Sequence, residues 1–261
     1  MSAPMIEISG LVAGYDGRAV LRGVTLSVGA GEFTGVLGPN GSGKTTLVRA
    51  VSGVLPPLSG SIRIGGDDIA ALPPKARAGR CATVAQKTPA LPGVRALSLV
   101  LMGRYPYVSL LGGYGAADVE RARAAMDETR SLHLRDRAAD TLSGGELQRV
   151  VMAKALTQDT ELLLLDEAAS SLDVARTVDL YELLKVRNAT GTTILTVAHD
   201  LNLAALYCRR LVFLKNGSVA ADGPTRDVFT AQTLSEIYET PLAVAPHPLT
   251  GAPQAHLVPR P

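Results

Sequence analysis

The stretch Gly38-Pro39-Asn40-Gly41-Ser42-Gly43-Lys44-Thr45 decides the fold of this chain. It matches G-x-x-x-x-G-K-[ST] at every fixed position, and it lies between the apolar run 33–37 and the helical spacing of residues 45–52. Glycines let the backbone wrap with its N–H groups inward, and a helix start adds about half a positive charge. The pattern therefore predicts a phosphate-binding loop between a strand and a helix.

The side chains of this loop fit a nucleoside triphosphate. Lys44 is expected to reach the β- and γ-phosphates, and the hydroxyl of Thr45 is expected to ligate Mg²⁺. The alternative, a chance glycine-rich turn, is disfavoured by the strand before it and the helix after it. We expect nucleotide contacts along the whole segment: Gly38, Pro39, Asn40, Gly41, Ser42, Gly43, Lys44, Thr45 and Thr46.

Two acidic residues, Asp166 and Glu167, follow the apolar run 162–165. A fully apolar strand is typical of a buried parallel sheet, and such sheets bind ligands at the carboxyl ends of their strands. Asp166 is expected to hold Mg²⁺, directly or through water, and Glu167 to polarise the water that attacks the γ-phosphate. Taken alone, the pair could equally be solvated acids at a strand end; the phosphate loop upstream favours the catalytic interpretation.

A third motif is Leu142-Ser143-Gly144-Gly145-Glu146. Ser143 and Glu146 have the spacing of a capping box for a helix that runs to about Leu156. Capping does not need two glycines inside the helix start, where each lowers helix stability. Glycines there would let a phosphate approach the exposed N–H groups, so the motif predicts a cap and an anion site in one.

Taken in order along the chain, these motifs resemble the signature set of ATP-binding cassette (ABC) ATPases, over residues 6 to about 238. The resemblance implies that Tyr15 stacks on adenine, that Gln86 senses Mg²⁺ and the attacking water, and that His199 contacts the γ-phosphate. It also implies a D-loop at Ser171, Leu172 and Asp173. Each of these residues alone could be an ordinary turn, surface or strand-end residue.

One departure from the family pattern follows the catalytic glutamate. Members often carry Pro-Thr there, whereas this chain has Ala168-Ala169. The change leaves Glu167 in place and affects only the expected rigidity of the following loop.

Composition restricts the function further. Lys and Arg number 26 against 24 Asp and Glu, so a net charge of +2 gives no basic footprint for nucleic acid. The hydrophobic fraction of 46% supports a sizeable core, and no run of about 18 uncharged apolar residues predicts a membrane span. Two cysteines, Cys81 and Cys208, and the absence of a secretion signal indicate buried thiols in a reducing compartment.

The resemblance implies an α/β fold: a P-loop NTPase core with a parallel sheet, an antiparallel β subdomain near the N-terminus, and an inserted α-helical subdomain. We expect one ABC ATPase domain over residues 1–240, with the helical insertion at about 87–157 and a loop at 105–115. Asn216-Gly217 predicts a type I′ hairpin, and Thr233-Leu-Ser-Glu236 predicts the capping box of a short helix. The proline-rich tail 241–261 is expected to be irregular.

The resemblance also implies partners. Two copies would form a head-to-tail homodimer, with each ATP between one phosphate loop and the other copy's 142–146 motif, and with Asp173 linking the two sites. Membrane-spanning permease subunits would be separate chains, served by an extracellular or periplasmic substrate-binding protein. We expect this chain at the cytoplasmic face of the membrane, as a peripheral subunit. Residues 87–115 would receive the permease through exposed residues such as Leu97, Tyr105, Tyr107 and Leu110.

The transported solute is indicated by two segments, residues 102–107 and 246–253, which are similar to those of importers of iron–siderophore complexes, haem and cobalamin. A cassette for another solute, such as a metal or oxyanion, or for export, remains an alternative. A nucleic-acid or ribosome ATPase is a further alternative. It is disfavoured by the single phosphate loop, the short 86–142 interval without heptads, and the near-neutral charge.

Overall fold

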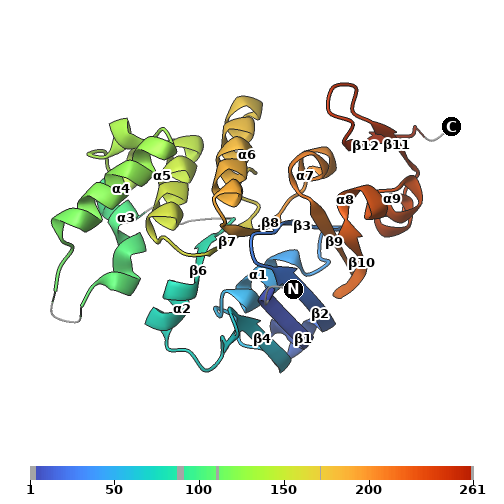
Figure 1. The fold of residues 1–261 in the computed structure, drawn as a ribbon, viewed down its shortest axis with the longest axis horizontal. Helices are drawn as coiled ribbons and strands as arrows, with labels where there is room; N and C mark the ends of the chain where they lie inside the picture. The colour runs from blue at the N-terminus through green and yellow to red at the C-terminus, as the bar shows by residue number, and fades with distance from the viewer. Residues whose placement is uncertain (1–3, 87–90, 110–111, 171, 260–261) are drawn as a thin grey trace. The chain divides into compact units, whose positions relative to one another are not determined.

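The structure, a computed structural model, describes residues 4–86, 91–109, 112–170 and 172–259. It consists of two compact units (Figure 1). The first contains Met1–Ala71 and Thr193–Pro261, and the second contains Leu72–Thr192. The chain therefore leaves the first unit once and returns to it. Each unit has its own sheet pairings and core.

An antiparallel sheet forms the first part of unit one, shown in blue to teal in Figure 1. It contains β1 (Pro4–Tyr15), β2 (Arg18–Gly29), β4 (Ser59–Ile64) and β5 (Asp67–Asp68), in the order β2-β1-β4-β5. Alternating apolar residues bury one face, with Ile6, Ile8 and Leu21 at most 1% exposed. This is the antiparallel β subdomain that the sequence predicted.

Parallel strands form the second part of unit one. β3 (Phe33–Leu37) pairs in parallel with β8 (Thr193–Val197) and with β9 (Arg210–Lys215), and both β3 and β8 are buried throughout. β10 (Ser218–Pro224) returns antiparallel to β9 through Asn216 and Gly217, whose φ values of 53° and 82° confirm the predicted type I′ turn. Helices α1 (Lys44–Val51) and α7 (Leu201–Tyr207) follow β3 and β8.

The second unit contains one parallel strand pair and a group of helices. β6 (Cys81–Val84) pairs with β7 (Leu162–Asp166), and α2 (Pro74–Arg80) and α6 (Val174–Ala189) flank them in the sequence. Helices α3 (Ala96–Leu101), α4 (Ala116–Glu128) and α5 (Gly144–Thr157) pack on one another around buried Leu99, Met126 and Val150. Short 3-10 turns η2 (Leu132–Leu134) and η3 (Ala139–Thr141) join α4 to α5.

The loop predicted over 105–115 is wrong at its start. A 3-10 helix, η1 (Met102–Tyr107), continues directly from α3 and includes Pro106. Gly103 explains the position, because a Cβ there would lie 2.2 Å from the backbone oxygen of Lys154. The missing side chain lets the segment press against α5, and the contact holds residues that sequence alone would leave in a loop.

Two expectations for the C-terminal part are also wrong. Helix α9 (Ala231–Tyr238), which follows α8 (Thr225–Val228), begins two residues before Thr233, because the Thr230 hydroxyl accepts the Thr233 N–H at 3.1 Å and caps the helix. The tail is not irregular either. β11 (Leu242–Pro246) pairs antiparallel with β12 (Pro253–Leu257), and Pro246 faces Pro253 at the strand ends, where the missing N–H groups cost little.

Among the described residues, none of the helices has both the length and the apolar character needed to cross a bilayer.

Candidate functional site

The predicted phosphate loop joins β3 to α1 in the first unit. Gly38, Gly41 and Gly43 have φ values of 144°, 77° and 105°, a region that side-chain-bearing residues rarely adopt. A Cβ on Gly38 would lie 2.1 Å from the Leu214 carbonyl oxygen, and one on Gly43 would lie 2.6 Å from Leu21 Cδ2. Glycine is therefore required at both ends of the loop, by conformation and by packing together.

The start of α1 has no side-chain cap. Gly43 caps the helix without a side-chain acceptor, and no acidic residue lies in the first turn. Backbone N–H groups and the helix dipole are therefore not neutralised by the chain's own capping groups. Such a helix start is a site where a phosphate is favoured.

The side chains of the loop are arranged around the same point of the fold. Lys44 is 5% exposed, and its ammonium donates to the carbonyl oxygens of Gly38 at 2.8 Å and Pro39 at 3.1 Å. Within the described residues, the buried hydroxyl of Ser42 has no hydrogen-bond partner. A buried hydroxyl without a partner is uncommon and fits a ligand that supplies the missing bond. Asn40 is exposed, Thr45 is half-buried and Thr46 is buried.

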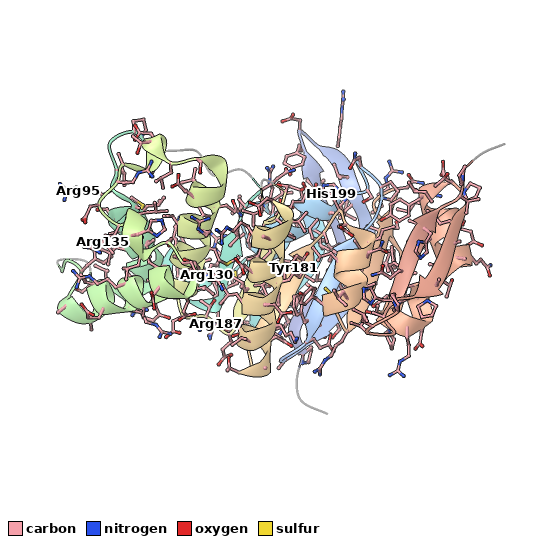
Figure 2. The ribbon with its side chains drawn as sticks, turned by 90° about the horizontal axis from the view of Figure 1, so that it is seen from above. Arg95, Arg130, Arg135, Tyr181, Arg187 and His199 are labelled. Atoms are coloured by element: carbon pink, nitrogen blue, oxygen red, sulfur yellow. The ribbon has the colours of Figure 1, made fainter. Side chains whose placement is uncertain are left out.

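Two further candidates, Tyr15 and His199, lie in the same unit. Tyr15 ends β1 with its ring 39% exposed, and its hydroxyl accepts a hydrogen bond from Arg49 of α1 at 3.0 Å. His199 is exposed two residues after β8 (Figure 2). Because β3 and β8 are parallel, with Val36 beside Val197, His199 and the phosphate loop leave the sheet at the same edge.

The second unit brings three other candidates together. β6 and β7 are parallel, with Val84 beside Leu165, so the residues that follow them share one sheet edge. There the side-chain amide of Gln86 donates a hydrogen bond to Glu167 Oε2. Asp166 and Glu167 are 4% and 8% exposed. Glu167 also has a φ of 54°, a left-handed backbone conformation that is uncommon for glutamate.

The predicted capping box at the start of α5 is confirmed. Ser143 Oγ accepts the Glu146 N–H at 3.4 Å, and Glu146 Oε2 accepts the Ser143 N–H at 2.8 Å. The Ser143 backbone N–H, then the Ser143 hydroxyl, hold the pKa of Glu146 below its usual value, and Arg137 adds to the effect at 3.0 Å. Arg137 is a partner that the sequence did not indicate.

The two glycines of this motif are not explained by packing within the unit. A Cβ on Gly144 would meet no atom within 4 Å, and one on Gly145 would make only an ordinary 3.8 Å contact with Leu172. Leu142, just before the helix, is half-buried. The structure thus leaves open space over the first turn of α5, which is what the anion-site interpretation requires.

Two of the three D-loop candidates, Leu172 and Asp173, lie within the described residues. Ser171 lies outside the described residues. Asp173 caps α6, where its carboxylate accepts the Arg176 N–H at 2.8 Å. Leu172 lies beside Gly145, so the D-loop and the α5 motif are neighbours within the second unit.

The candidate contact segment 87–115 is described only in part, and Leu110 lies outside the described residues. Tyr105 and Tyr107 are 53% and 50% exposed, and Leu97 is half-buried. Arg104 anchors the segment by bonding the Thr157 carbonyl at 3.0 Å and Asp118 at 2.9 Å. Tyr105 is thus presented to solvent from a fixed base, whereas Tyr107 is half exposed, with the Arg104 guanidinium 4.0 Å from its ring centre and its hydroxyl donating to the Gln158 carbonyl at 2.9 Å.

Comparisons with known proteins agree on one family. The family model described as "ABC transporter" matches residues 21–170. The ferric enterobactin transport ATP-binding protein FepC of Escherichia coli is 36% identical over 244 residues, which cover 93% of this chain and 90% of FepC. The hemin import ATP-binding protein HmuV of Nocardia farcinica is 40% identical over 236 residues, covering 90% of this chain and 81% of that protein.

Solved structures show the same fold. A chain of an inward-facing transporter, described as of metal-chelate type, has a TM-score of 0.83 at 24% identity, covering 98% of both chains. The bacterial ABC transporter cassette MJ0796, solved as a dimer, has a TM-score of 0.78 at 27% identity, covering 85% of this chain and 99% of that one. These matches confirm the α/β cassette fold that the sequence predicted.

Proposed function

This chain belongs to the ABC transporter family and is an ATP-binding, ATP-hydrolysing subunit, and on that premise we propose that it powers the import of iron–siderophore complexes, haem or cobalamin. The observation that carries the ATPase function is the 38–46 loop. Its lysine, Lys44, is buried, and the helix that follows has no side-chain cap and no acidic residue in its first turn. The phosphates of a triphosphate carry the negative charge that a lysine ammonium and a helix start attract.

We assign the hydrolytic roles to residues at the carboxyl ends of the strands. Glu167 polarises the attacking water, and its position is supported by the hydrogen bond from Gln86. His199 contacts the γ-phosphate, supported by its exposure at the same sheet edge as the phosphate loop. Tyr15 stacks on adenine, supported by its exposed ring.

The donors proposed for Mg²⁺ fit that ion. Thr45 offers a hydroxyl, Gln86 an amide oxygen and Asp166 a carboxylate, and Mg²⁺ prefers oxygen ligands. When bound, the ion would neutralise charge on the phosphates during transfer.

We further propose that two copies pair head-to-tail. Ser143, Gly144 and Gly145 of one copy would contact the nucleotide on the other copy's phosphate loop, and Asp173 would link the two sites. The open space over Gly144 supports this role, since packing within the chain gives no reason for glycine there. In each copy, the cap that stabilises α5 would also orient the N–H groups toward the phosphate.

ATP hydrolysis would be coupled to membrane-spanning permease subunits. A substrate-binding protein would dock on these subunits at the extracellular or periplasmic face. This chain would sit at the cytoplasmic face of the membrane. Exposed Tyr105 and Tyr107 support a protein contact there, because amphipathic aromatic side chains are enriched in such interfaces. The solute group rests on the similarity to relatives that serve ferric enterobactin and hemin.

The test begins with tagged full-length chain recovered from detergent-solubilised membranes of its own source. We expect a multi-span membrane protein in stoichiometric amount, identified by mass spectrometry. The substrate-binding protein encoded beside that permease is then titrated with a ferric siderophore, haem and cobalamin. Binding of any of the three supports the proposal. Binding of only a free metal ion or oxyanion would reassign the solute, and recovery of ribosomes or DNA with no membrane protein would overturn the transport function.

A further inference from the structure

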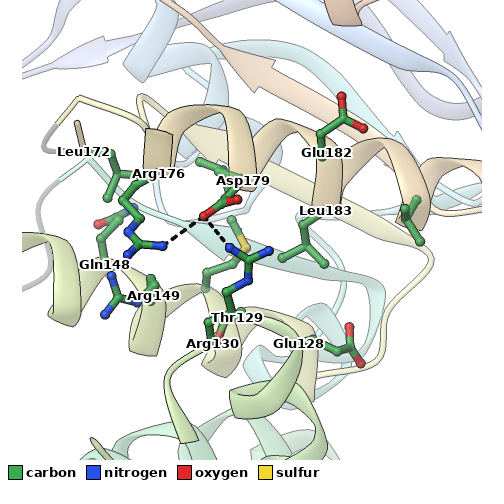
Figure 3. Close-up of a pocket in the computed structure, with 13 residues that line it drawn as sticks. Glu128, Thr129, Arg130, Gln148, Arg149, Leu172, Arg176, Asp179, Glu182 and Leu183 are labelled. Atoms are coloured by element: carbon green, nitrogen blue, oxygen red, sulfur yellow. Dashed lines mark hydrogen bonds and ion pairs between the residues drawn. The ribbon is translucent and has the colours of Figure 1, made fainter. Parts of the chain in front are cut away.

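A cavity of about 430 Å³ lies within the second unit, between the end of α4, the middle of α5 and the length of α6 (Figure 3). Small-molecule sites in proteins commonly enclose about 300–1,000 Å³, so the cavity has room for a ligand. Of the described residues assigned to nucleotide binding or dimer contact, Leu172 alone lines it. The proposed ATPase function does not use it.

Apolar side chains form much of the cavity wall. Leu172, Leu180, Leu183 and Val186 come from the D-loop and α6, and Met152 comes from α5. Val186 is 60% exposed, whereas Leu180 and Met152 are buried at 8% and 2%. The cavity therefore has a buried apolar interior and an apolar residue at its edge, which suits an aliphatic or aromatic body.

The acidic side chains of the wall are already paired. Asp179 accepts from Arg130 at 2.8 Å and from Arg176 at 3.0 Å, as the dashed lines in Figure 3 show. The other two acids are paired with basic residues outside the wall, in the pairs Glu128–Arg187 and Glu182–Lys185. None of the three carboxylates is thus left to neutralise a further cation in the wall.

Arg149 is that further cation. It lies on α5, and its Nε is buried without a hydrogen-bond partner. Within the described part of the chain, its guanidinium takes part in no hydrogen bond or ion pair. A buried Nε–H without an acceptor is unfavourable, because this donor has lost water without gaining a partner.

We propose that this cavity binds a small amphipathic monoanion, namely a carboxylate with an aliphatic chain. The apolar wall takes the chain, and Arg149 pairs with the carboxylate, whose two oxygens match the fork of a guanidinium. Among the residues that the structure describes, Arg149 is the arginine of this wall with no carboxylate partner, since Arg130 and Arg176 both bond Asp179, and one carboxylate would supply that partner. An inorganic phosphate would leave the apolar wall unused, and a neutral alkane would leave Arg149 unpaired.

The bound carboxylate would contact both α5 and α6, the helices that begin at the 142–146 motif and the D-loop. α5 begins at the Ser143 cap, and α6 begins at Asp173, so a ligand that touches both would restrain the first turns of each. Binding itself does not depend on nucleotide, so it is measured on the full chain without ATP. If the ATPase proposal failed, the carboxylate could still bind in this cavity. If the carboxylate did not bind, the ATPase proposal would be unaffected.

The experiment is isothermal titration calorimetry with three probes: octanoate, octanamide and acetate. Octanamide keeps the chain and removes the charge, whereas acetate keeps the charge and removes the chain. We expect octanoate to saturate one site, with an affinity at least about tenfold tighter than that of either control. Equal affinity for octanamide would show an apolar groove only. Equal affinity for acetate would show a plain anion site. Either result would overturn the proposal, as would the absence of octanoate binding.

Variants place the ligand in this cavity. Arg149→Met keeps an unbranched apolar stem, removes the guanidinium charge and should weaken octanoate binding by about tenfold. Arg123→Met is the matched control, because Arg123 pairs with Glu120 on α4 and does not line the cavity. Unchanged octanoate affinity in folded Arg149→Met would refute the assignment.

A second pair of variants covers the case in which Arg149→Met does not fold. Val186 is exposed, so Val186→Glu should fold and should repel the carboxylate from the cavity edge. Val186→Gln has nearly the same shape without the charge and should bind octanoate more tightly than Val186→Glu. If both variants bound octanoate as the wild type does, the ligand would lie elsewhere and the proposal would fail.

Discussion

The side-chain amide of Gln86 donates a hydrogen bond to the carboxylate of Glu167, although 81 positions separate the two residues. The parallel register of β6 and β7 brings them to one sheet edge. The carboxylate is 8% exposed and its backbone is left-handed, so its position is fixed by the strand, the turn and the amide together. This is the arrangement from which the catalytic prediction follows.

Glu167→Gln should abolish most ATP hydrolysis and keep ATP binding. The amide has the same size as the carboxylate but cannot accept a proton from water. Loss of a general base typically lowers the rate by about 10²–10⁴-fold. The measurements are phosphate release and binding of a fluorescent ATP analogue. Glu161→Gln, which changes an exposed acid just before the same strand, is the control and should keep full activity. Full turnover in Glu167→Gln would remove the assigned role.

Gly144→Ala should stabilise the chain or leave its stability unchanged, while it lowers ATPase activity. Alanine favours a helix over glycine by up to about 1 kcal/mol, and the added Cβ would meet nothing within 4 Å. The same methyl group would obstruct a phosphate at the helix start. Thermal unfolding and steady-state ATPase activity, measured on the same variant, test whether activity falls while stability does not. Unchanged ATPase activity would show that the glycine serves no ligand.

Ser143→Ala is the matched comparison, because it should lower both the thermal stability and the ATPase activity. Removing the N-cap typically costs about 1 kcal/mol of stability. If Gly144→Ala and Ser143→Ala changed activity only in proportion to stability, the α5 motif would be a cap and not a nucleotide contact.

The features that sequence predicted well are those encoded locally. The 38–45 loop, the Ser143–Glu146 box and the Asn216–Gly217 turn each depend on a few adjacent residues, whose chemistry sets their geometry. The features missed depend on distant contacts. The tail hairpin is held where Asn202 bonds the backbone of Ala255, 53 positions away, at 3.2 and 2.6 Å.

The candidate site shows the same contrast between features encoded locally and features that depend on distant contacts. The pairing of Gln86 with Glu167 needs the register of two strands, which the residues alone do not state, and only the family resemblance led to Gln86. Nor did any spacing point to Arg149, because its cavity is assembled from three helices. The sequence pointed to Thr233 as the cap of the last helix, whereas in the fold Thr230 caps α9.

Glu146 should make stability sensitive to acid. Its pKa is held below the ordinary value of 4.5 by the Ser143 N–H and hydroxyl. A carboxyl whose pKa is lower in the folded state contributes stability above its unfolded pKa and loses it as the pH falls through the folded value. The difference in melting temperature between wild type and Glu146→Gln should therefore be largest near pH 7 and shrink below pH 4.5. A difference that is constant across this range would contradict the assigned bonds.

Gly38→Ala should be far more damaging than Gly41→Ala. The first places a Cβ 2.1 Å from the Leu214 oxygen at a φ of 144°, so the loop or β9 must move. The second meets nothing within 4 Å and suffers only backbone strain, which costs about 1–2 kcal/mol. Urea unfolding and ATP-analogue binding measure the two effects. Equal losses in the two variants would show that the contact with Leu214 does not constrain the loop.

Both cysteines should resist thiol reagents until the chain unfolds. Cys81 and Cys208 are 6% and 3% exposed, and burial raises the pKa of Cys81 to about 11 and also raises that of Cys208. The reactive thiolate is therefore scarce near neutral pH. Disulfide-exchange titration with a chromogenic reagent at pH 8 should give no fast reaction in the native protein and two equivalents in denaturant.

The same shifts set the alkaline stability. A thiol whose pKa is higher in the folded state keeps its proton longer there, so folding loses stability as the pH rises above 9, the ordinary value, through about 11 for Cys81. Cys81→Ala should reduce this alkaline loss relative to wild type, measured as melting temperature from pH 8 to pH 11. If Cys81 reacted with the reagent at pH 8 as fast as a free thiol does, the strand β6 would be open to solvent, and its pairing with β7 beside Glu167 would not be stable.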